Sequence, residues 1–376
     1  MELTILLILL TIFSVWIFIK RKKFSFHGKF PFVYFGMYRT NWGIKLMDVL
    51  VKKYPKLLKL SCSFAIITGF LGMILVSYDI LKTIYKIIFV TKSVPTVGLV
   101  LPIKATGVFY VPLIYWIIVL AFLAIIHEFA HGVIARLYNV KIKSTGFAFL
   151  GILIPIIPAA FVEPDEKKLE KKTSKEQLSI FAAGPFINIV CGLLFMLLFF
   201  QVLTPLSAEL YNYNGLEITG LFGGETPAKL AGLSVGEIIQ EINGVKLETI
   251  SDFKRIFEGK IEGEMLNLVT NNGIYEITLG NEGLLGVFVE ENKNLINAVW
   301  YNQLLVWFKD LIYWMFILNL GVGLFNLIPI GPIDGGRMLH VVLQKILPHK
   351  HARRIWYSVS AVFLVSILGS VLVSFI

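Results

Sequence analysis

The chain has little charge for its length. Asp, Glu, Lys and Arg together make up 16% of its 376 residues, whereas they account for about 25% of soluble globular proteins. Hydrophobic residues reach 56%, and the mean hydropathy is +0.75. This balance excludes an ordinary soluble domain and predicts a protein embedded in a membrane.

Cysteine is also scarce. The chain has two cysteines, Cys62 and Cys191, which lie far apart in apolar segments. Such a count excludes a disulfide-stapled scaffold and a metal site built from cysteine. We expect both residues to be buried packing thiols.

Positive charge is present but unevenly spread. The net charge is +10, yet residues 204–300 contain 14 Asp and Glu against 6 Lys and Arg, so the excess of basic residues lies elsewhere. Basic loops beside apolar segments set membrane orientation and attract anionic lipid. The charge pattern therefore predicts a lipid bilayer as partner and no nucleic acid.

Six apolar stretches are long enough to cross about 30 Å of hydrocarbon. They cover about 3–19, 60–81, 110–136, 178–203, 304–327 and 356–376. The first is expected to be an uncleaved anchor, because the cluster Lys20–Lys23 follows the apolar run rather than preceding it. The basic loop 20–59 should be cytoplasmic. Alternation then places 82–109 and 204–303 outside, and 137–177 and 328–355 inside.

The third span contains the sequence His127-Glu128-Phe129-Ala130-His131. Each ionisable group at bilayer depth costs about 2.5–3.5 kcal/mol on insertion scales, so three in five residues require a compensating partner. Positions i and i+4 share one helix face, which lets both histidines reach one Zn²⁺ ion. Glu128 lies beside them and could take a proton from a metal-bound water.

Asp334 is the best third ligand that the sequence offers. It lies just past the cytoplasmic end of the fifth span, at the depth that His127 and His131 approach. Pro329 and Pro332 must break the helix there, while Gly335 and Gly336 permit close backbone approach. An Asp-Gly turn is the alternative interpretation. Three further histidines read as structural or surface residues: His340, His349 and His351.

These residues together resemble the site-2 protease family of intramembrane metalloproteases. The family pairs HExxH with a later N-x-x-P-x-x-x-x-D-G segment, here Asn326 to Pro329 followed by Asp334-Gly335, and Phe181–Asn188 is a further family-like element. The resemblance implies one zinc ion per chain, held by His127, His131 and Asp334, with Glu128 as catalytic acid and base. It further implies substrate binding around Asn326 and Pro329, with Asn326 contacting the substrate backbone or supporting the oxyanion.

Residues 139–162 are too rich in Gly and Pro for a spanning helix. We expect extended strands that dip into the membrane beside the site, as in this family. The charged tract Glu163–Glu176 should then be a solvated cytoplasmic loop.

Residues 213–290 resemble a PDZ domain of the permuted type found in bacterial-style proteases. The resemblance rests on Ala231-Gly232-Leu233 followed by Gly236-Glu237 and Ile242-Asn243-Gly244. Five short runs are predicted strands, namely Leu216–Leu221, Glu237–Ile242, Met265–Thr270, Gly273–Leu279 and Gly286–Glu290. Asn243-Gly244 suits a tight turn, and Ser251–Phe257 is the expected helix, with Ser251 as its N-cap. Such a domain binds a peptide as an added strand or acts as a shield.

The sequence therefore predicts an α-helical polytopic membrane protein with about six transmembrane helices, a short membrane-dipping β element and an inserted α+β PDZ domain. The expected domains are an anchor and basic loop (1–59), two membrane halves (60–203 and 304–376) and the PDZ domain (213–290). The expected location is the cell membrane, with the active site near the cytoplasmic side and the PDZ domain outside.

The predicted function is zinc-dependent cleavage of transmembrane segments in single-span membrane proteins. Two alternatives remain. One is a membrane-anchored zincin that degrades soluble or unfolded proteins, and the other is a non-catalytic PDZ-bearing membrane scaffold. A non-ligand Glu beside the metal site argues against the scaffold, because a structural metal needs no base.

Overall fold

The protein is described by a computed structural model, which covers residues 2–29, 33–89, 98–152, 154–280, 283–296 and 299–374. The chain forms two compact units. The first joins Met1–Phe199 to Asp310–Ile376, and the second is Phe200–Lys309. The residues of both predicted metal motifs lie in the first unit.

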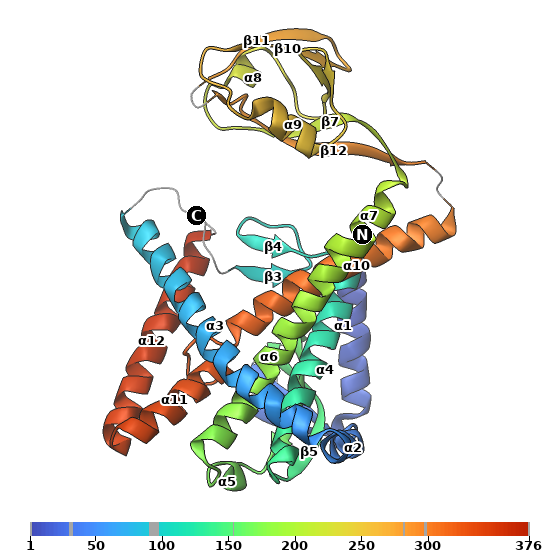
Figure 1. The fold of residues 1–376 in the computed structure, drawn as a ribbon. Coiled ribbons are helices and arrows are strands. Elements are labelled where there is room, and N and C mark those ends of the chain that lie inside the picture. The colour runs from blue at the N-terminus through green and yellow to red at the C-terminus, as the bar shows by residue number, and fades with distance from the viewer. Residues whose placement is uncertain are drawn as a thin grey trace. The chain divides into compact units, whose positions relative to one another are not determined.

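Figure 1 follows the elements along the chain. The helices are α1 (Glu2–Ile19), η1 (Arg21–Lys23), α2 (Ile44–Lys53), α3 (Pro55–Phe89), α4 (Leu113–Leu137), α5 (Glu166–Leu169), α6 (Ser174–Leu198), η2 (Phe199–Leu203), α7 (Thr204–Ala208), α8 (Pro227–Leu230), α9 (Ile250–Phe257), α10 (Trp300–Phe325), α11 (Asp334–Ile346) and α12 (His349–Ser374). The strands are β1 (Phe24–Lys29), β2 (Val33–Thr40), β3 (Leu99–Leu101), β4 (Val108–Tyr110), β5 (Ile142–Ile152), β6 (Ile154–Pro164), β7 (Tyr211–Leu221), β8 (Ile238–Ile242), β9 (Val245–Lys246), β10 (Met265–Thr270), β11 (Ile274–Thr278) and β12 (Val287–Leu295).

Five helical stretches among the described residues are long and apolar enough to cross a membrane, which makes this a multi-pass membrane protein. They are α3, α4, the continuous stretch Ser174–Ala208, α10 and α12. The predicted first span forms helix α1, but many of its side chains lie outside the described set, so six spans remain a prediction. α3 continues to Phe89, so Lys82 and Lys86 belong to this helix and not to the loop predicted after residue 81.

The first compact unit, called the membrane unit from here on, contains a four-stranded antiparallel sheet in the order β1-β2-β5-β6. The expectation of extended strands within 139–162 is confirmed by β5 and β6. The expectation of a loop over Glu163–Glu176 is wrong: β6 continues to Pro164, α5 follows, and α6 begins at Ser174. Glu163 remains in the strand because it accepts a hydrogen bond from Ser144 Oγ at 2.6 Å on the neighbouring strand.

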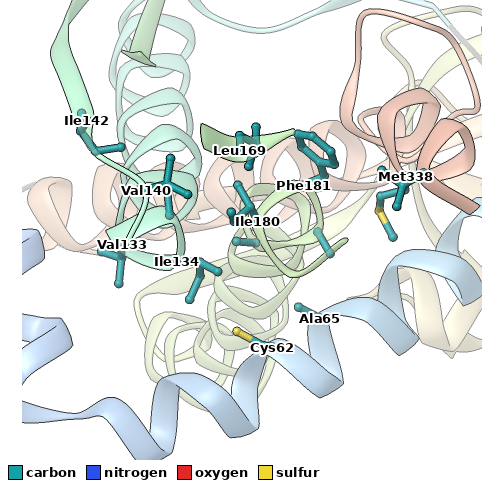
Figure 2. Packing of buried hydrophobic residues seen from close by; sticks show 14 of the residues in the cluster. Cys62, Ala65, Val133, Ile134, Val140, Ile142, Leu169, Ile180, Phe181 and Met338 are labelled. Carbon is teal, nitrogen blue, oxygen red and sulfur yellow. The ribbon is translucent and has the colours of Figure 1, made fainter. Parts of the chain in front are cut away.

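The main hydrophobic core of the membrane unit gathers α3, α4, α6 and α11 around one cluster of buried side chains. Figure 2 shows Cys62 and Ala65 from α3 facing Ile180 and Phe181 from α6, with Met338 of α11 beside them. The expectation that Cys62 is a buried thiol is confirmed, whereas Cys191 is only partly buried. This packing fixes α4, α6 and α11 against one another, and these three helices supply the candidate site.

The second unit contains a six-stranded sheet in the order β11-β10-β8-β7-β12, with β9 paired to β8. Its core consists of side chains that alternate along the strands, such as Leu216 and Ile218 on β7. All five strand predictions fall on observed strands, although β7 and β12 pair beyond the predicted limits of the domain, to Tyr211 and Leu295. Asn243 and Gly244 have φ angles of 50° and 77° and join β8 to β9, which confirms the predicted tight turn.

Helix α9 begins one residue earlier than expected and has a different cap. Thr249, not Ser251, is the N-cap. Its hydroxyl accepts from the backbone N–H of Asp252, and the Asp252 carboxylate accepts from the backbone N–H of Thr249. The reason is that an acidic residue stands three positions after Thr249, as a capping box requires, whereas Lys254 stands three positions after Ser251. These bonds hold the pKa of Asp252 below its usual value.

Candidate metal centre

Helix α4 presents two histidines from one face. His127 is buried and His131 is partly buried. Their ring centroids are 4.8 Å apart, and their Nε2 atoms are 3.1 Å apart. This closeness follows from the spacing of four residues, because side chains at i and i+4 lie one above the other on a helix.

Asp334 reaches the same place from the other half of the chain. α10 ends at Phe325, and the backbone turns through the Asn326–Ile333 segment before α11 begins at Asp334. The amide of Gly335 donates to the carbonyl of Asn326 at 2.7 Å, which holds the start of α11 against the end of α10. A Cβ atom on Gly335 would lie 2.6 Å from Ile328 O, so the predicted close backbone approach is confirmed.

Three ligand atoms converge on one point. Asp334 Oδ2 lies 3.1 Å from His127 Nε2 and 3.3 Å from His131 Nε2. A tetrahedral zinc ion with bonds of about 2.0–2.1 Å places its ligand atoms roughly 3.3 Å apart. The spacing of the three atoms therefore fits one zinc ion, and these residues form the metal-ligand cluster of the described chain.

The hydrogen-bond partners of the two Nδ1 atoms determine the tautomer of each histidine. His131 Nδ1 is 2.6 Å from Ile180 O, a carbonyl that can only accept, so Nδ1 carries the proton and Nε2 presents a lone pair. His127 Nδ1 lies 3.2 Å from the side-chain amide of Asn188, whose Oδ1 has no partner among the described residues. Turning the amide so that its oxygen and nitrogen exchange places lets Oδ1 accept from Nδ1 and leaves His127 Nε2 as a second lone pair.

Two imidazole lone pairs and a carboxylate oxygen then face one another at little more than 3 Å. Three acceptors in a buried space are unfavourable without a positive charge between them. A divalent cation would satisfy all three at once, and two nitrogen donors with one oxygen donor suit Zn²⁺. The donor chemistry of His127, His131 and Asp334 thus fits the predicted metal.

One face of α6 completes the surroundings. Ile180, Gly184 and Asn188 are spaced by four residues and all point at the histidines: Ile180 O bonds His131, Asn188 bonds His127, and Gly184 lies between. A Cβ atom on Gly184 would be 2.6 Å from His127 Nε2 and closer still to His131 Nε2. The missing side chain of Gly184 therefore keeps open the space beside the two ligand nitrogens.

Glu128 follows His127 in the chain and is held by the sheet. Its Oε2 accepts a hydrogen bond from the backbone N–H of Val162 on β6 at 3.0 Å. Glu128 is not part of the three-residue ligand cluster. A carboxylate placed beside the ligands but outside their cluster suits proton transfer rather than coordination.

The remaining predicted site residues have clear positions. The side chain of Asn326 donates to Val322 O at 3.0 Å, one turn earlier in the chain, and Pro329 is buried. His340 stacks on Trp356 with ring centroids 4.6 Å apart, and burial together with nearby His349 and Arg353 lowers its pKa. His340 lies outside the metal-ligand cluster.

The structure brings the three predicted ligand residues together in one cluster, whereas the contacts of Ile180 and Gly184 with the histidines were not predicted. Asn188 lies at the end of the family-like element Phe181–Asn188, and in the structure its side-chain amide contacts His127 on the neighbouring helix. The spacing of 180, 184 and 188 was the available signal, since residues four apart share a helix face. Nothing in that spacing alone identified the partner helix.

Comparisons with known proteins agree with this geometry. The model of peptidase family M50 matches residues 115–367. An uncharacterized protein of Methanocaldococcus jannaschii is 30% identical over 337 residues, spanning 87% of this chain and 83% of that protein. A protein of Rickettsia conorii, named as a candidate zinc metalloprotease, is 25% identical over 355 residues, 68% of this chain and 96% of its own. A Clostridium acetobutylicum protein with the same description is 30% identical over 192 residues, 43% of this chain and 52% of its own.

Proposed function

The chain belongs to peptidase family M50, and on that basis we propose that it is a zinc-dependent endopeptidase that cleaves peptide bonds within transmembrane segments. The observation that carries the proposal is the convergence of two histidines and an aspartate from separate halves of the chain, with Glu128 beside them. Metalloprotease activity follows from the family and from its relatives named as zinc metalloproteases. That the cleavage takes place inside the membrane goes beyond the family assignment and is our proposal.

Each residue of the centre has a task in this reaction. His127, His131 and Asp334 would hold the ion, which when bound polarises the scissile carbonyl and makes a coordinated water more acidic. Glu128 accepts the proton of the attacking water and passes it to the leaving amine. Asn188 and Ile180 keep the two imidazoles in the tautomer that leaves Nε2 free.

Asn326 and Pro329 are the proposed substrate-binding residues. Asn326 stands at the end of α10, eight residues before Asp334, and its amide is half-buried. In the described structure this amide donates to Val322 O of α10, so substrate contact requires it to exchange Val322 O for the peptide backbone. Pro329 prevents the helix from continuing and so supports the turn that carries Asp334.

A transmembrane substrate suits the location of the centre. The two histidines lie near the end of spanning helix α4, and Asp334 follows spanning helix α10. Peptide bonds in a helical segment are shielded by their own hydrogen bonds, so a single-span substrate must unwind before cleavage. The charge pattern of the loops supports an active site near the cytoplasmic face of the cell membrane and the 213–290 domain outside.

We propose that residues 213–290 form a PDZ domain. The strand order, the Asn243-Gly244 turn and helix α9 support this assignment. The domain either excludes substrates with bulky outer portions or recruits a peptide ligand as an added strand. We favour exclusion, because the loop charges predict this domain outside and His127 near the cytoplasmic side, and a domain outside would have no access to the scissile bond.

Deleting 213–290 separates these two roles. Exclusion predicts that cleavage of a short single-span peptide is unchanged while bulky substrates become accessible. Recruitment predicts a higher KM with little change in kcat, because binding shared by ground and transition states is lost. A large loss of kcat on the short peptide contradicts both roles.

The enzymatic proposal is tested by incubating the purified protein in liposomes with single-span peptides, with and without a zinc chelator. We expect the peptides to be cleaved, the chelator to abolish this cleavage, and added zinc to restore it. A parallel incubation with an unfolded soluble protein identifies a membrane-anchored protease of soluble substrates. Zinc binding without cleavage of either substrate class would support the scaffold alternative.

A further inference from the structure

A cavity lies beside Glu128, against helix α4. It has a volume of about 330 Å³ and is bounded by α4, β5, β6 and the chain around Trp42. Its walls include the aromatic rings of Phe129, Phe147 and Phe161. This volume falls at the small end of the range for ligand pockets in proteins.

Glu128 is the one ionisable side chain among the described residues that line this cavity. The two lining hydroxyls already have partners: Thr145 Oγ1 donates to Trp42 O at 2.7 Å, and Thr40 Oγ1 donates to Thr145 O at 3.1 Å. An occupant therefore meets apolar walls with a carboxylate at one place. A charged or strongly polar occupant would be buried without partners, which is unfavourable.

Strand β6 connects this cavity to the position of Glu128. β6 is the outer strand of its sheet, and the backbone N–H of Val162 on this strand donates to Glu128 of α4. Ala160 is two residues away, pairs opposite Phe147, and so directs its backbone to the same edge as Val162. Both residues also line the cavity. The edge, the carboxylate and the cavity are therefore next to one another.

We propose that this cavity is the specificity subsite of the enzyme and that it receives a large apolar side chain, such as Phe, Leu or Met, from the residue beside the scissile bond. The inference rests on the proposed function, because it places the substrate by the position of Glu128. The base must be within hydrogen-bond reach of the water that attacks the carbonyl. A side chain adjacent to that carbonyl is therefore the part of the substrate closest to a cavity that Glu128 itself lines.

The test uses the full-length protein in liposomes and a set of single-span peptides that differ at one position. The cleavage site is first located by mass spectrometry, and the residues on its two sides are then varied among Ala, Leu, Phe and Trp. The subsite predicts that kcat/KM for Phe or Leu on one side exceeds that for Ala by about tenfold or more, as apolar pockets discriminate. Chelator-sensitive cleavage without such a preference overturns the subsite while leaving the proposed function intact.

Two variants assign the preference to this cavity. Ala160→Phe fills the cavity and should reduce the preference for large side chains about tenfold, whereas Phe161→Ala enlarges it and should favour Trp. Ser61→Phe is the matched control. Ser61 lines a neighbouring cavity of about 760 Å³ between α2, α3, α4 and α6, which shares Trp42, Ile125 and Phe129 with this one, but Ser61 itself does not line the cavity beside Glu128. Zinc content checks folding of each variant, and Phe161→Ala carries the test if Ala160→Phe does not fold. An unchanged preference in a folded Phe161→Ala variant overturns the assignment, while absence of any cleavage by the zinc-loaded parent overturns the proposed function instead.

Discussion

The side-chain amide of Asn188 on α6 lies 3.2 Å from His127 Nδ1 on α4, and both residues are buried. The amide oxygen is the acceptor that a metal-binding imidazole needs at its outer nitrogen. This contact therefore ties the tautomer of His127 to a helix that contributes no ligand of its own.

Asn188→Leu should weaken zinc binding by about 10–100-fold, because loss of an outer-shell partner typically costs that much. Asn188→Asp should retain most of the affinity, since a carboxylate oxygen also accepts from Nδ1. Chelator competition on the purified protein measures both. Asn319→Leu is the matched control, because Asn319 is equally buried but bonds Met315 O in its own helix. Equal zinc affinity in Asn188→Leu and the parent would contradict the assigned role.

Gly184→Ala should abolish zinc binding, because the added methyl group would occupy the space next to both ligand nitrogens. Metal analysis after purification with zinc provides the readout. Gly321→Ala on α10 is the control, since a Cβ atom there meets nothing within 4 Å and alanine favours a helix. A Gly184→Ala protein with a full complement of zinc would show that the ion binds elsewhere.

Removing any one of the three ligands should strip the ion. His127→Ala, His131→Ala and Asp334→Ala each leave two donors, whereas a zinc protease site requires three protein ligands and an open position. His340→Ala should keep the ion, because His340 stacks on Trp356 away from the cluster. Retention of zinc by Asp334→Ala would remove Asp334 from the site and reopen the search for a third ligand.

The orientation of the chain can be tested by labelling. Ser251 is exposed on α9, and Lys52 is exposed on α2. In sealed vesicles a membrane-impermeant maleimide should label Ser251→Cys only from the outer side and Lys52→Cys only from the cytoplasmic side. The parent protein controls for Cys62 and Cys191. Labelling of Ser251→Cys from the cytoplasmic side alone would reverse the predicted orientation.

The three residues of the candidate metal centre could be picked out from the sequence because each lies in a local pattern, and the structure brings them together. His127 and His131 are one helical turn apart, and Asp334 stands in a segment that its prolines and glycines mark as a broken helix. The residues that surround the site in the folded protein were harder to predict from the sequence. Gly184 looks like any helical glycine in sequence, and only the approach of α4 shows why a side chain there would collide with the ligands.

The sheet β1-β2-β5-β6 could also be predicted only in part. Strands β5 and β6 were predicted because their Gly and Pro content excludes a helix. β1 and β2 were missed, since the basic residues around them suggested a loop and pairing with β5 joins segments more than 100 residues apart. The cap of α9 was misplaced for a local reason: Thr249 and Ser251 are both good N-caps, and Asp252 at the third helical position decides between them.

The most direct test of the account compares Glu128→Gln with the parent protein in zinc content and in cleavage of a single-span peptide. Glu128 lies outside the ligand cluster, so the variant should bind zinc as the parent does. Glutamine cannot accept the proton of the attacking water, so kcat should fall by about 10²–10⁴-fold. A Glu128→Gln protein that holds zinc and cleaves the peptide at the parental rate would contradict the proposed mechanism.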